Sequence, residues 1–134
     1  KEYRRQRQMC IRDSFWSLSF AVTAETWTRL GGFDEAYEGY GAEDTDLGRR
    51  ARSLGMRVQW VGGAHAYHQW HPAGSPPWRH LDDILRNGAL FAERWGEWPM
   101  RGWMDSFIEG GAVEPHGDGY RRIASGTGVR SVQA

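Results

Sequence analysis

The feature that most constrains the fold is a helical pattern over residues 78–95. Leu81, Leu85, Ala89 and Ala92 recur there at helical spacing, and Ile84, Phe91 and Trp95 lie beside them. A helix with an apolar face of this length must bury it against another element. Gly96 follows directly and predicts where the helix ends.

Shorter helices are predicted on both sides of this one. Thr23 is a favourable N-cap for a helix over residues 24–30, and Gly31 stands where a terminating glycine is common. Residues 43–54 begin with acidic side chains and end with arginines, a distribution that complements the helix dipole. Residues 98–109 predict a further short helix.

Two apolar segments predict strands. Residues 14–22 mix aromatic and small side chains and predict a buried strand, and residues 56–61 alternate in polarity. After residue 114 the chain has few apolar residues, so residues 115–134 are predicted to be mostly disordered. Strands and helices without a regular βαβ alternation indicate a mixed class, α/β or α+β.

Composition excludes several classes of protein. The chain has 134 residues, enough for one domain or part of one. Lys and Arg number 17 and so do Asp and Glu, so no net charge draws the chain to nucleic acid. No apolar run approaches the roughly 20 residues of a membrane span, and no signal peptide is visible.

These observations predict an arrangement of the chain. We expect a polar linker or helix end over residues 1–12, one domain over residues 13–112 and a disordered tail over residues 113–134. Cys10 is the single cysteine, which excludes an internal disulfide framework and fits a reducing compartment.

A cluster of carboxylates is the first candidate site. Glu43, Asp44 and Asp46 fall at the start of a predicted helix, just after glycines that allow a ligand to approach the backbone. The helix dipole favours their ionised form, and an ionised carboxylate can accept a proton from a sugar hydroxyl. Acidic residues are also what the first turn of any helix prefers, so spacing alone leaves a structural role open.

The segment from His65 to His71 is the second candidate. Three histidines recur there at i, i+3 and i+6, and on a strand His68 would face away from the other two. A zinc site of three histidines is therefore not expected, whereas one histidine combined with carboxylates from elsewhere is easier to build. Each histidine could equally belong to an aromatic cluster.

Four blocks, taken in order, resemble a known family. Residues 31–35 (Gly-Gly-Phe-Asp-Glu), 39–44 (Gly-Tyr-Gly-Ala-Glu-Asp), 46–50 and 66–69 resemble the C-terminal half of inverting glycosyltransferases of the GT-A fold. The resemblance is to family 2 enzymes of the chondroitin-polymerase type and to the galactosyltransferase C-terminal module. It covers roughly residues 13–95.

The resemblance implies roles for the acidic cluster. Asp44 matches the catalytic base that deprotonates the acceptor hydroxyl, and Glu43 and Asp46 match acids that contact the acceptor or orient the base. Tyr40 and Gly41 would lie against the acceptor. Asp44-Thr45-Asp46 also spells the Asp-x-Asp motif of nucleotide-sugar enzymes, but it opens a helix and is not taken as a metal site.

The resemblance also implies a cofactor. His68 matches a ligand of Mn²⁺ or Mg²⁺, and His71 and Arg79 would contact the diphosphate or the loop over it. Asp44 and His68 would then converge on one sugar pocket.

The implied function is metal-assisted, inverting transfer from a nucleotide-diphospho-sugar to a carbohydrate or other hydroxyl acceptor. This chain would supply the acceptor side and the base. The nucleotide-binding N-terminal half of the fold is absent from the sequence, so the chain alone is expected to be inactive. The expected location is the cytoplasm, with the inner membrane face as one place of action.

Two alternatives remain open. Eight tryptophans allow a non-catalytic carbohydrate-binding module that stacks sugars on Tyr40, Trp70 and Trp78. A small metal protein that uses the histidines of the 65–71 segment is the other. Tyr40 and Ala42 replace the Trp and Gly usual in the family, which leaves the acceptor open, and the donor sugar is not indicated either.

Overall fold

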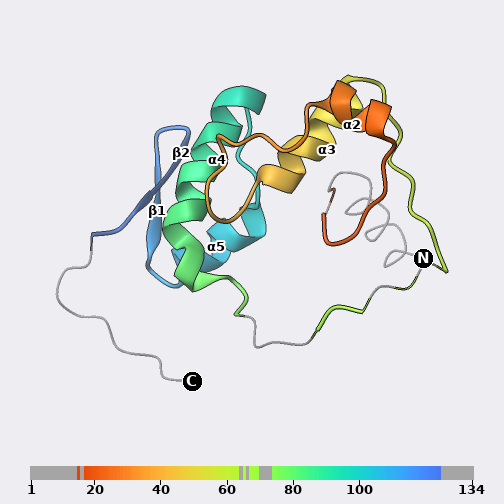
Figure 1. Cartoon of the computed structure of the whole chain (residues 1–134). Coiled ribbons are helices and arrows are strands. Elements are labelled where there is room, and N and C mark those ends of the chain that lie inside the picture. Colours follow the sequence, from red (N-terminus) through yellow and green to blue (C-terminus); the bar gives the residue numbers. More distant parts are fainter. Residues whose placement is uncertain (1–14, 16, 64, 66, 70–73, 125–134) are drawn as a thin grey trace, which may run out of the picture. The chain divides into compact units, whose positions relative to one another are not determined.

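The chain divides into two compact units. The computed structural model describes residues 15, 17–63, 65, 67–69 and 74–124 (Figure 1). Unit 1 is Lys1–Ala73 and unit 2 is Gly74–Ala134. This boundary falls inside the single domain predicted for residues 13–112, and the predicted linker over residues 1–12 lies outside the described residues.

Unit 1 contains helix α2, Ala24–Leu30, and its predicted boundaries are confirmed. The hydroxyl of Thr23 accepts a hydrogen bond from the backbone N–H of Thr26 at 3.2 Å, which satisfies one of the free donors at the start of the helix. Gly31 ends the helix at φ 80°, in the left-handed region that favours glycine.

Helix α3, Glu43–Ser53, follows in unit 1 and packs against α2. It ends one residue before the predicted boundary, and Leu54 is its C-cap. Leu47 and Ala51, one turn apart, are its buried apolar residues. The acidic first turn and the arginines of the last turn are as the sequence predicted.

The two predicted strands of unit 1 are wrong. The described residues of the 14–22 segment form turns and irregular chain, and residues 56–61 form no strand. Leu18, Trp60 and Val61 are 78%, 60% and 72% exposed. A strand requires a partner for its backbone N–H and C=O groups, and neither segment pairs with a strand in the described part of the chain.

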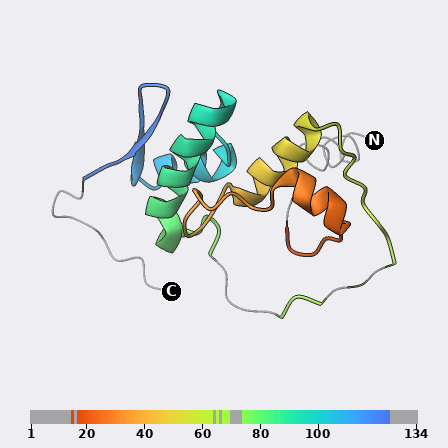
Figure 2. The ribbon, with the colours of Figure 1, turned by 45° about the horizontal axis from the view of Figure 1, so that its top comes forward.

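Unit 2 is built from helices and a hairpin. It contains the 3₁₀-helix η1 (Trp78–His80), α4 (Leu81–Trp95), α5 (Arg101–Glu109), β1 (Val113–His116) and β2 (Gly119–Arg122). The strands pair antiparallel, with Val113 opposite Arg122 and His116 opposite Gly119. In two views the hairpin lies beside α4 and α5, and β2 packs on α4 while β1 packs on α5 (Figures 1 and 2).

The core of unit 2 confirms the helical pattern that dominated the sequence. Helix α4 follows a single 3₁₀ turn and stops at Gly96, as expected. Helix α5 begins three residues later than predicted, at Arg101. Both helices bury apolar side chains in one cluster with the first strand and the segment between the helices: Leu81, Ile84, Trp98, Met104, Phe107 and Val113.

Trp98 fills a slot between two glycines. A Cβ atom on Gly88 of α4 would lie 2.6 Å from Cζ2 of the indole, and one on Gly119 of β2 would lie 2.8 Å from Cζ3. Real Cβ atoms do not approach carbon that closely. The two glycines therefore allow helix and hairpin to close on the ring, and Tyr120 meets it edge-on with centroids 5.0 Å apart.

The hairpin corrects the predicted disordered tail. Residues 115–122, assigned to that tail, lie in the hairpin, and residues 125–134 lie outside the described residues. Val113 is 1% exposed, and Arg122 joins Asp82 of α4 at 2.6 Å in an exposed ion pair. Few apolar residues suffice here because α4 and α5 supply the surface against which the strands pack.

Candidate acceptor-side site

The loop before α3 has an unusual backbone. Gly39, Gly41 and Ala42 have φ values of 74°, 99° and 75°, all in the left-handed region. For Ala42, which is 1% exposed, this conformation costs on the order of 1–2 kcal/mol. The resemblance places a glycine at this position, and the backbone conformation explains why. The strained turn leads directly into the acidic first turn of α3.

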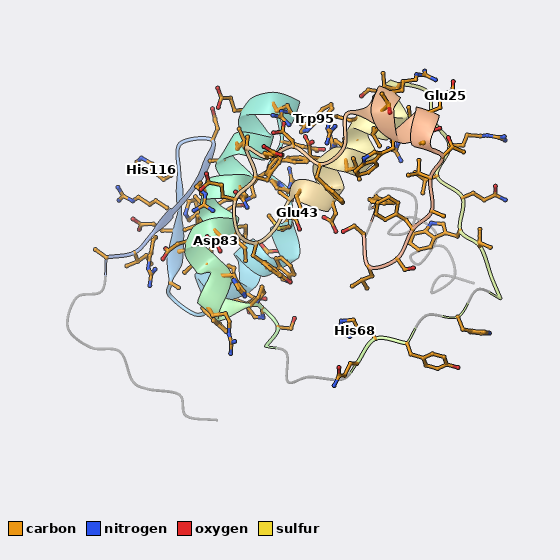
Figure 3. All side chains as sticks on the ribbon, viewed as in Figure 1. Glu25, Glu43, His68, Asp83, Trp95 and His116 are labelled. Atoms are coloured by element: carbon orange, nitrogen blue, oxygen red, sulfur yellow. The ribbon has the colours of Figure 1, made fainter. Side chains whose placement is uncertain are left out.

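The three carboxylates of that turn have different surroundings. Asp44 is half-buried, and the hydroxyl of Thr45 donates to its Oδ1 at 3.3 Å. Glu43 is half-buried as well, and its Oε2 is shielded from solvent without a hydrogen bond from the described residues. Asp46 is fully buried. Figure 3 labels Glu43 at the start of α3.

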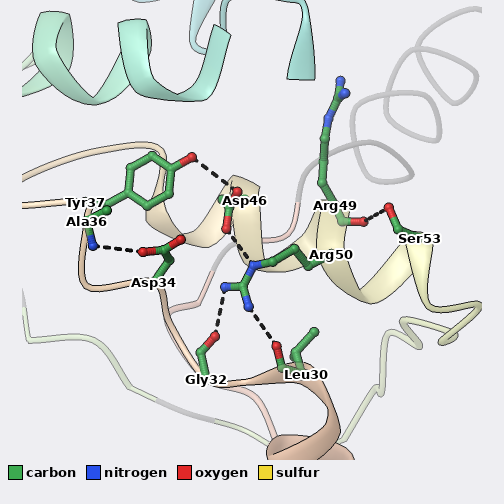
Figure 4. A network of polar contacts seen from close by, with 9 residues as sticks. All are labelled: Leu30, Gly32, Asp34, Ala36, Tyr37, Asp46, Arg49, Arg50 and Ser53. Carbon is green, nitrogen blue, oxygen red and sulfur yellow. Dashed lines mark hydrogen bonds and ion pairs between the residues drawn. The ribbon is translucent and has the colours of Figure 1, made fainter. Parts of the chain in front are cut away.

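Asp46 is engaged at both carboxylate oxygens. The Tyr37 hydroxyl donates to Oδ1 at 3.2 Å, and Nε of Arg50 donates to Oδ2 at 2.7 Å (Figure 4). A fully buried carboxylate held in this way offers little to an incoming sugar. Of its two predicted roles, the geometry favours orientation of the turn over contact with the acceptor.

Tyr37 and Arg50 were missed by the sequence reasoning. The i, i+4 spacing of Asp46 and Arg50 on a predicted helix was a visible signal for the ion pair. No pattern in the sequence indicated the Tyr37 contact, because it depends on the conformation of an irregular loop.

Tyr40 and Gly41 differ in their accessibility. Tyr40 is 40% exposed, so its ring can offer a face to a ligand. Gly41 is buried, so it offers no exposed surface for contact with an acceptor. Their acceptor-binding roles stay predictions.

The described residues of the histidine segment, 65 and 67–69, are exposed. His65 and His68 lie in described chain without helix or strand, and Figure 3 draws His68 on that segment. Trp70 and His71 lie outside the described residues. Arg79 is exposed in η1 of unit 2.

The described residues do not form a metal site by themselves. Across the described ranges, no group of three His, Cys, Asp or Glu side chains is placed to hold a metal ion. His68 alone does not fit Mn²⁺ or Mg²⁺, which take six or more ligands, mainly oxygen atoms. For the alternative of a histidine-metal protein, His65 and His68 likewise form no such group with other described residues, and His71 lies outside the described residues.

Unit 1 also contains an open groove that the sequence did not indicate. Its volume is about 550 Å³, and mostly apolar residues of the 15–22 segment, α2, α3 and the 56–61 segment line it. Neither Asp44 nor His68 is among the lining residues. The expected convergence of these two groups on one pocket therefore stays a prediction.

Trp78, which the carbohydrate-binding alternative takes as a stacking platform, packs partly against the core of unit 2. Its ring meets Phe107 edge-on with centroids 4.9 Å apart, and a Cβ atom on Gly110 would lie 2.3 Å from it. The side chain is 48% exposed, so the remaining face is open. None of the helices in the described part of the chain combines the length and apolar character of a membrane span.

Comparisons with known proteins place these features in context. A family model described as the N-terminal domain of galactosyltransferase matches residues 10–72, which include the turn after α2, the left-handed loop and all of α3. The expected likeness to a galactosyltransferase module is thus confirmed at the level of glycosyltransferases. The assignment to family 2 and to the C-terminal half of a GT-A fold stays a prediction.

Two curated relatives agree with this match. Validoxylamine A glucosyltransferase of Streptomyces hygroscopicus subsp. jinggangensis (strain 5008) is 38% identical over 60 residues, which cover 41% of this chain and 14% of that protein. The protein of the same name from Streptomyces hygroscopicus subsp. limoneus is 38% identical over 60 residues, 13% of its length. The match thus spans about one seventh of these relatives. No solved structure matches the chain significantly.

Proposed function

We propose that this chain supplies the acceptor side and the catalytic base of a glycosyltransferase. The observation that carries the proposal is the first turn of α3, where half-buried Asp44 follows a strained loop and precedes a carboxylate fixed by two partners. This turn lies within the stretch that matches the galactosyltransferase family model.

The chemistry follows from the position of Asp44. Its Oδ1 accepts the Thr45 hydroxyl, so we assign Oδ2 to the acceptor. As the acceptor oxygen bonds to the anomeric carbon, its proton passes to Oδ2, and the bond from that carbon to the nucleoside diphosphate breaks on the opposite face. Attack from the face opposite the leaving group inverts the configuration. Tyr40 would stack on the sugar.

A divalent cation belongs to the proposal only as an expectation. When bound, Mn²⁺ or Mg²⁺ would offset the charge that develops on the departing diphosphate. His68 could give one ligand, and the others would come from outside the described residues, as would the donor-binding groups. We also expect His71 and Arg79 to contact the diphosphate or the loop over it.

A chimera tests the proposal. Residues 10–72 replace the matching stretch of the jinggangensis validoxylamine A glucosyltransferase, and transfer to validoxylamine A is measured. Asp44→Asn, which keeps the shape and removes the base, is expected to lower kcat by about 10²–10⁴-fold with KM little changed. The matched control is Glu25→Gln on exposed α2, with kcat unchanged.

Two results would contradict the proposal. A folded chimera that shows no transfer would indicate that this stretch does not act as a glycosyltransferase segment, and carbohydrate binding by the chain would then favour the binding module. Full transfer by Asp44→Asn would remove Asp44 from the role of base. Binding of one equivalent of Zn²⁺ by the chain alone would support the histidine-metal alternative.

A further inference from the structure

Arg50 joins three different parts of unit 1 through its guanidinium group. Its Nε donates to Asp46 at 2.7 Å, its Nη1 donates to the carbonyl of Leu30 at 2.7 Å, and its Nη2 donates to the carbonyl of Gly32 at 2.8 Å. The side chain is 22% exposed. Figure 4 shows these three bonds leaving one planar group in different directions.

The two carbonyls lie at the end of α2 and in the turn that follows it. Carbonyl groups at a helix C-terminus lack partners within the helix and carry the negative end of its dipole, so a cation there satisfies both. Arg50, which lies on α3, therefore connects the end of α2 to Asp46 in the first turn of α3.

Tyr37 closes the same network from the loop. Its hydroxyl meets Asp46, and its backbone N–H donates to the carbonyl of Asp34 at 3.2 Å. The Asp34 carboxylate in turn accepts from the N–H of Ala36 at 2.9 Å. The two bonds to Asp34 stay within the loop, and the Tyr37 hydroxyl joins this loop to the helix at the buried carboxylate, two residues after Asp44.

We infer that Arg50 is the positioning residue of the site, holding the first turn of α3 and the Gly39–Ala42 loop in one conformation so that Asp44 faces the acceptor. The inference rests on the proposed function, because it gives Arg50 its purpose through Asp44. Arg50 touches no substrate itself. The planar fork matters more than the charge, because lysine can neutralise Asp46 but cannot reach two carbonyls in fixed directions at the same time.

The test uses the full 134-residue chain and NMR. Arg50→Lys keeps the cation beside buried Asp46, so unit 1 is expected to stay folded. Backbone order parameters of Gly39–Thr45 are expected to fall from about 0.85 to below 0.6. The carboxyl ¹³C signal of Asp44 is expected to broaden or split.

Arg49→Lys is the matched control. It makes the same chemical change one residue earlier on α3, and Figure 4 shows the Arg49 side chain directed away from the Asp46–Arg50 pair. Order parameters in the loop should stay near the wild-type values. Arg50→Ala, which leaves the buried carboxylate without its cation, serves as a second variant and is expected to lose the loop order at least as completely.

The outcomes separate this inference from the proposed function. Unchanged order parameters and a single Asp44 signal in Arg50→Lys would overturn the positioning role, whatever the chimera does. A disordered loop together with an Asp44→Asn chimera that still transfers sugar would support Arg50 as the anchor of the turn and refute Asp44 as the base. If Arg50→Lys unfolds unit 1 entirely, the residue is a general structural support and the inference fails.

Discussion

The close packing of Trp98 between Gly88 and Gly119 can be tested by the substitution Gly88→Ala. The added methyl group would lie 2.6 Å from Cζ2 and 2.7 Å from Cε2 of the indole, inside van der Waals contact. The ring has little room to move away, because Gly119 of the hairpin packs so close on its other side that an added Cβ atom there would lie 2.8 Å from Cζ3. The clash must therefore be relieved by separating α4 from the hairpin.

The change in the free energy of unfolding caused by Gly88→Ala is the sum of two opposing contributions. Overpacking a core costs about 1–3 kcal/mol, and the rigid slot places this case at the upper end. Replacing glycine by alanine within a helix gains about 1 kcal/mol. The net loss of unfolding free energy is about 2 kcal/mol, equivalent to a fall in Tm of about 8–16 °C for a unit of this size.

Gly102→Ala is the matched control. Gly102 also lies in a helix of unit 2, but a Cβ atom there would meet nothing within 4 Å. Its substitution is expected to raise the stability by about 0.5–1 kcal/mol. Thermal unfolding followed by near-ultraviolet circular dichroism, which reports the packing of tryptophan, measures both variants. A rise in Tm for both would refute the tight slot.

A double variant isolates the contact. Gly88→Ala combined with Trp98→Phe removes the part of the ring that clashes, so the two changes should cost less together than the sum of their separate effects. If the two losses of unfolding free energy are simply additive, the effect of Gly88→Ala does not arise from a clash with the indole.

Three further substitutions test other parts of the fold by thermal unfolding. Ala42→Gly is expected to stay within about 1 kcal/mol of the wild type, whereas Ala42→Val should lose more than about 2 kcal/mol because a branched side chain is forced into a buried left-handed position; equal effects would contradict the strain argument. Thr23→Ala should cost about 1 kcal/mol through loss of the N-cap, while the exposed Thr28→Ala should be nearly neutral, and no difference between them would remove the cap from the account. Phe107→Ala should cost about 3–5 kcal/mol and redden the fluorescence of Trp78, and a loss below 1 kcal/mol would show that the core is not tightly packed there.

The helices could be predicted from the sequence because their signals are local. Thr23 and Gly31 act on α2 within a few residues, and the apolar stripe of α4 is visible in any short window. Capping bonds and helix periodicity depend on neighbours three or four positions away, which a single sequence contains.

The strands could not be predicted because strand formation depends on distant partners. Residues 56–61 have the composition of a strand but pair with none in the described chain, whereas Gly119–Arg122 looks polar and forms one. In the second case the deciding surface is α4, which provides Asp82 as the partner of Arg122, 40 residues away in the sequence. Pairing of this kind cannot be deduced from composition.

The candidate site was predicted in part. The acidic turn and its place at the start of α3 could be located from residue types and spacing. The burial of Asp46, the contact with Tyr37 and the two carbonyls held by Arg50 depend on where an irregular loop folds back, and no residue pattern encodes that path.

The short sequence separation of the contacts around Arg50 has a consequence for how the region could assemble. Its partners Leu30 and Gly32 precede it by only 20 and 18 residues, and Asp46 lies one turn earlier on its own helix. Closing so small a loop takes little entropy, so this arrangement can form early as the chain collapses. All of these contacts lie within one continuous stretch of the chain, from Leu30 to Arg50.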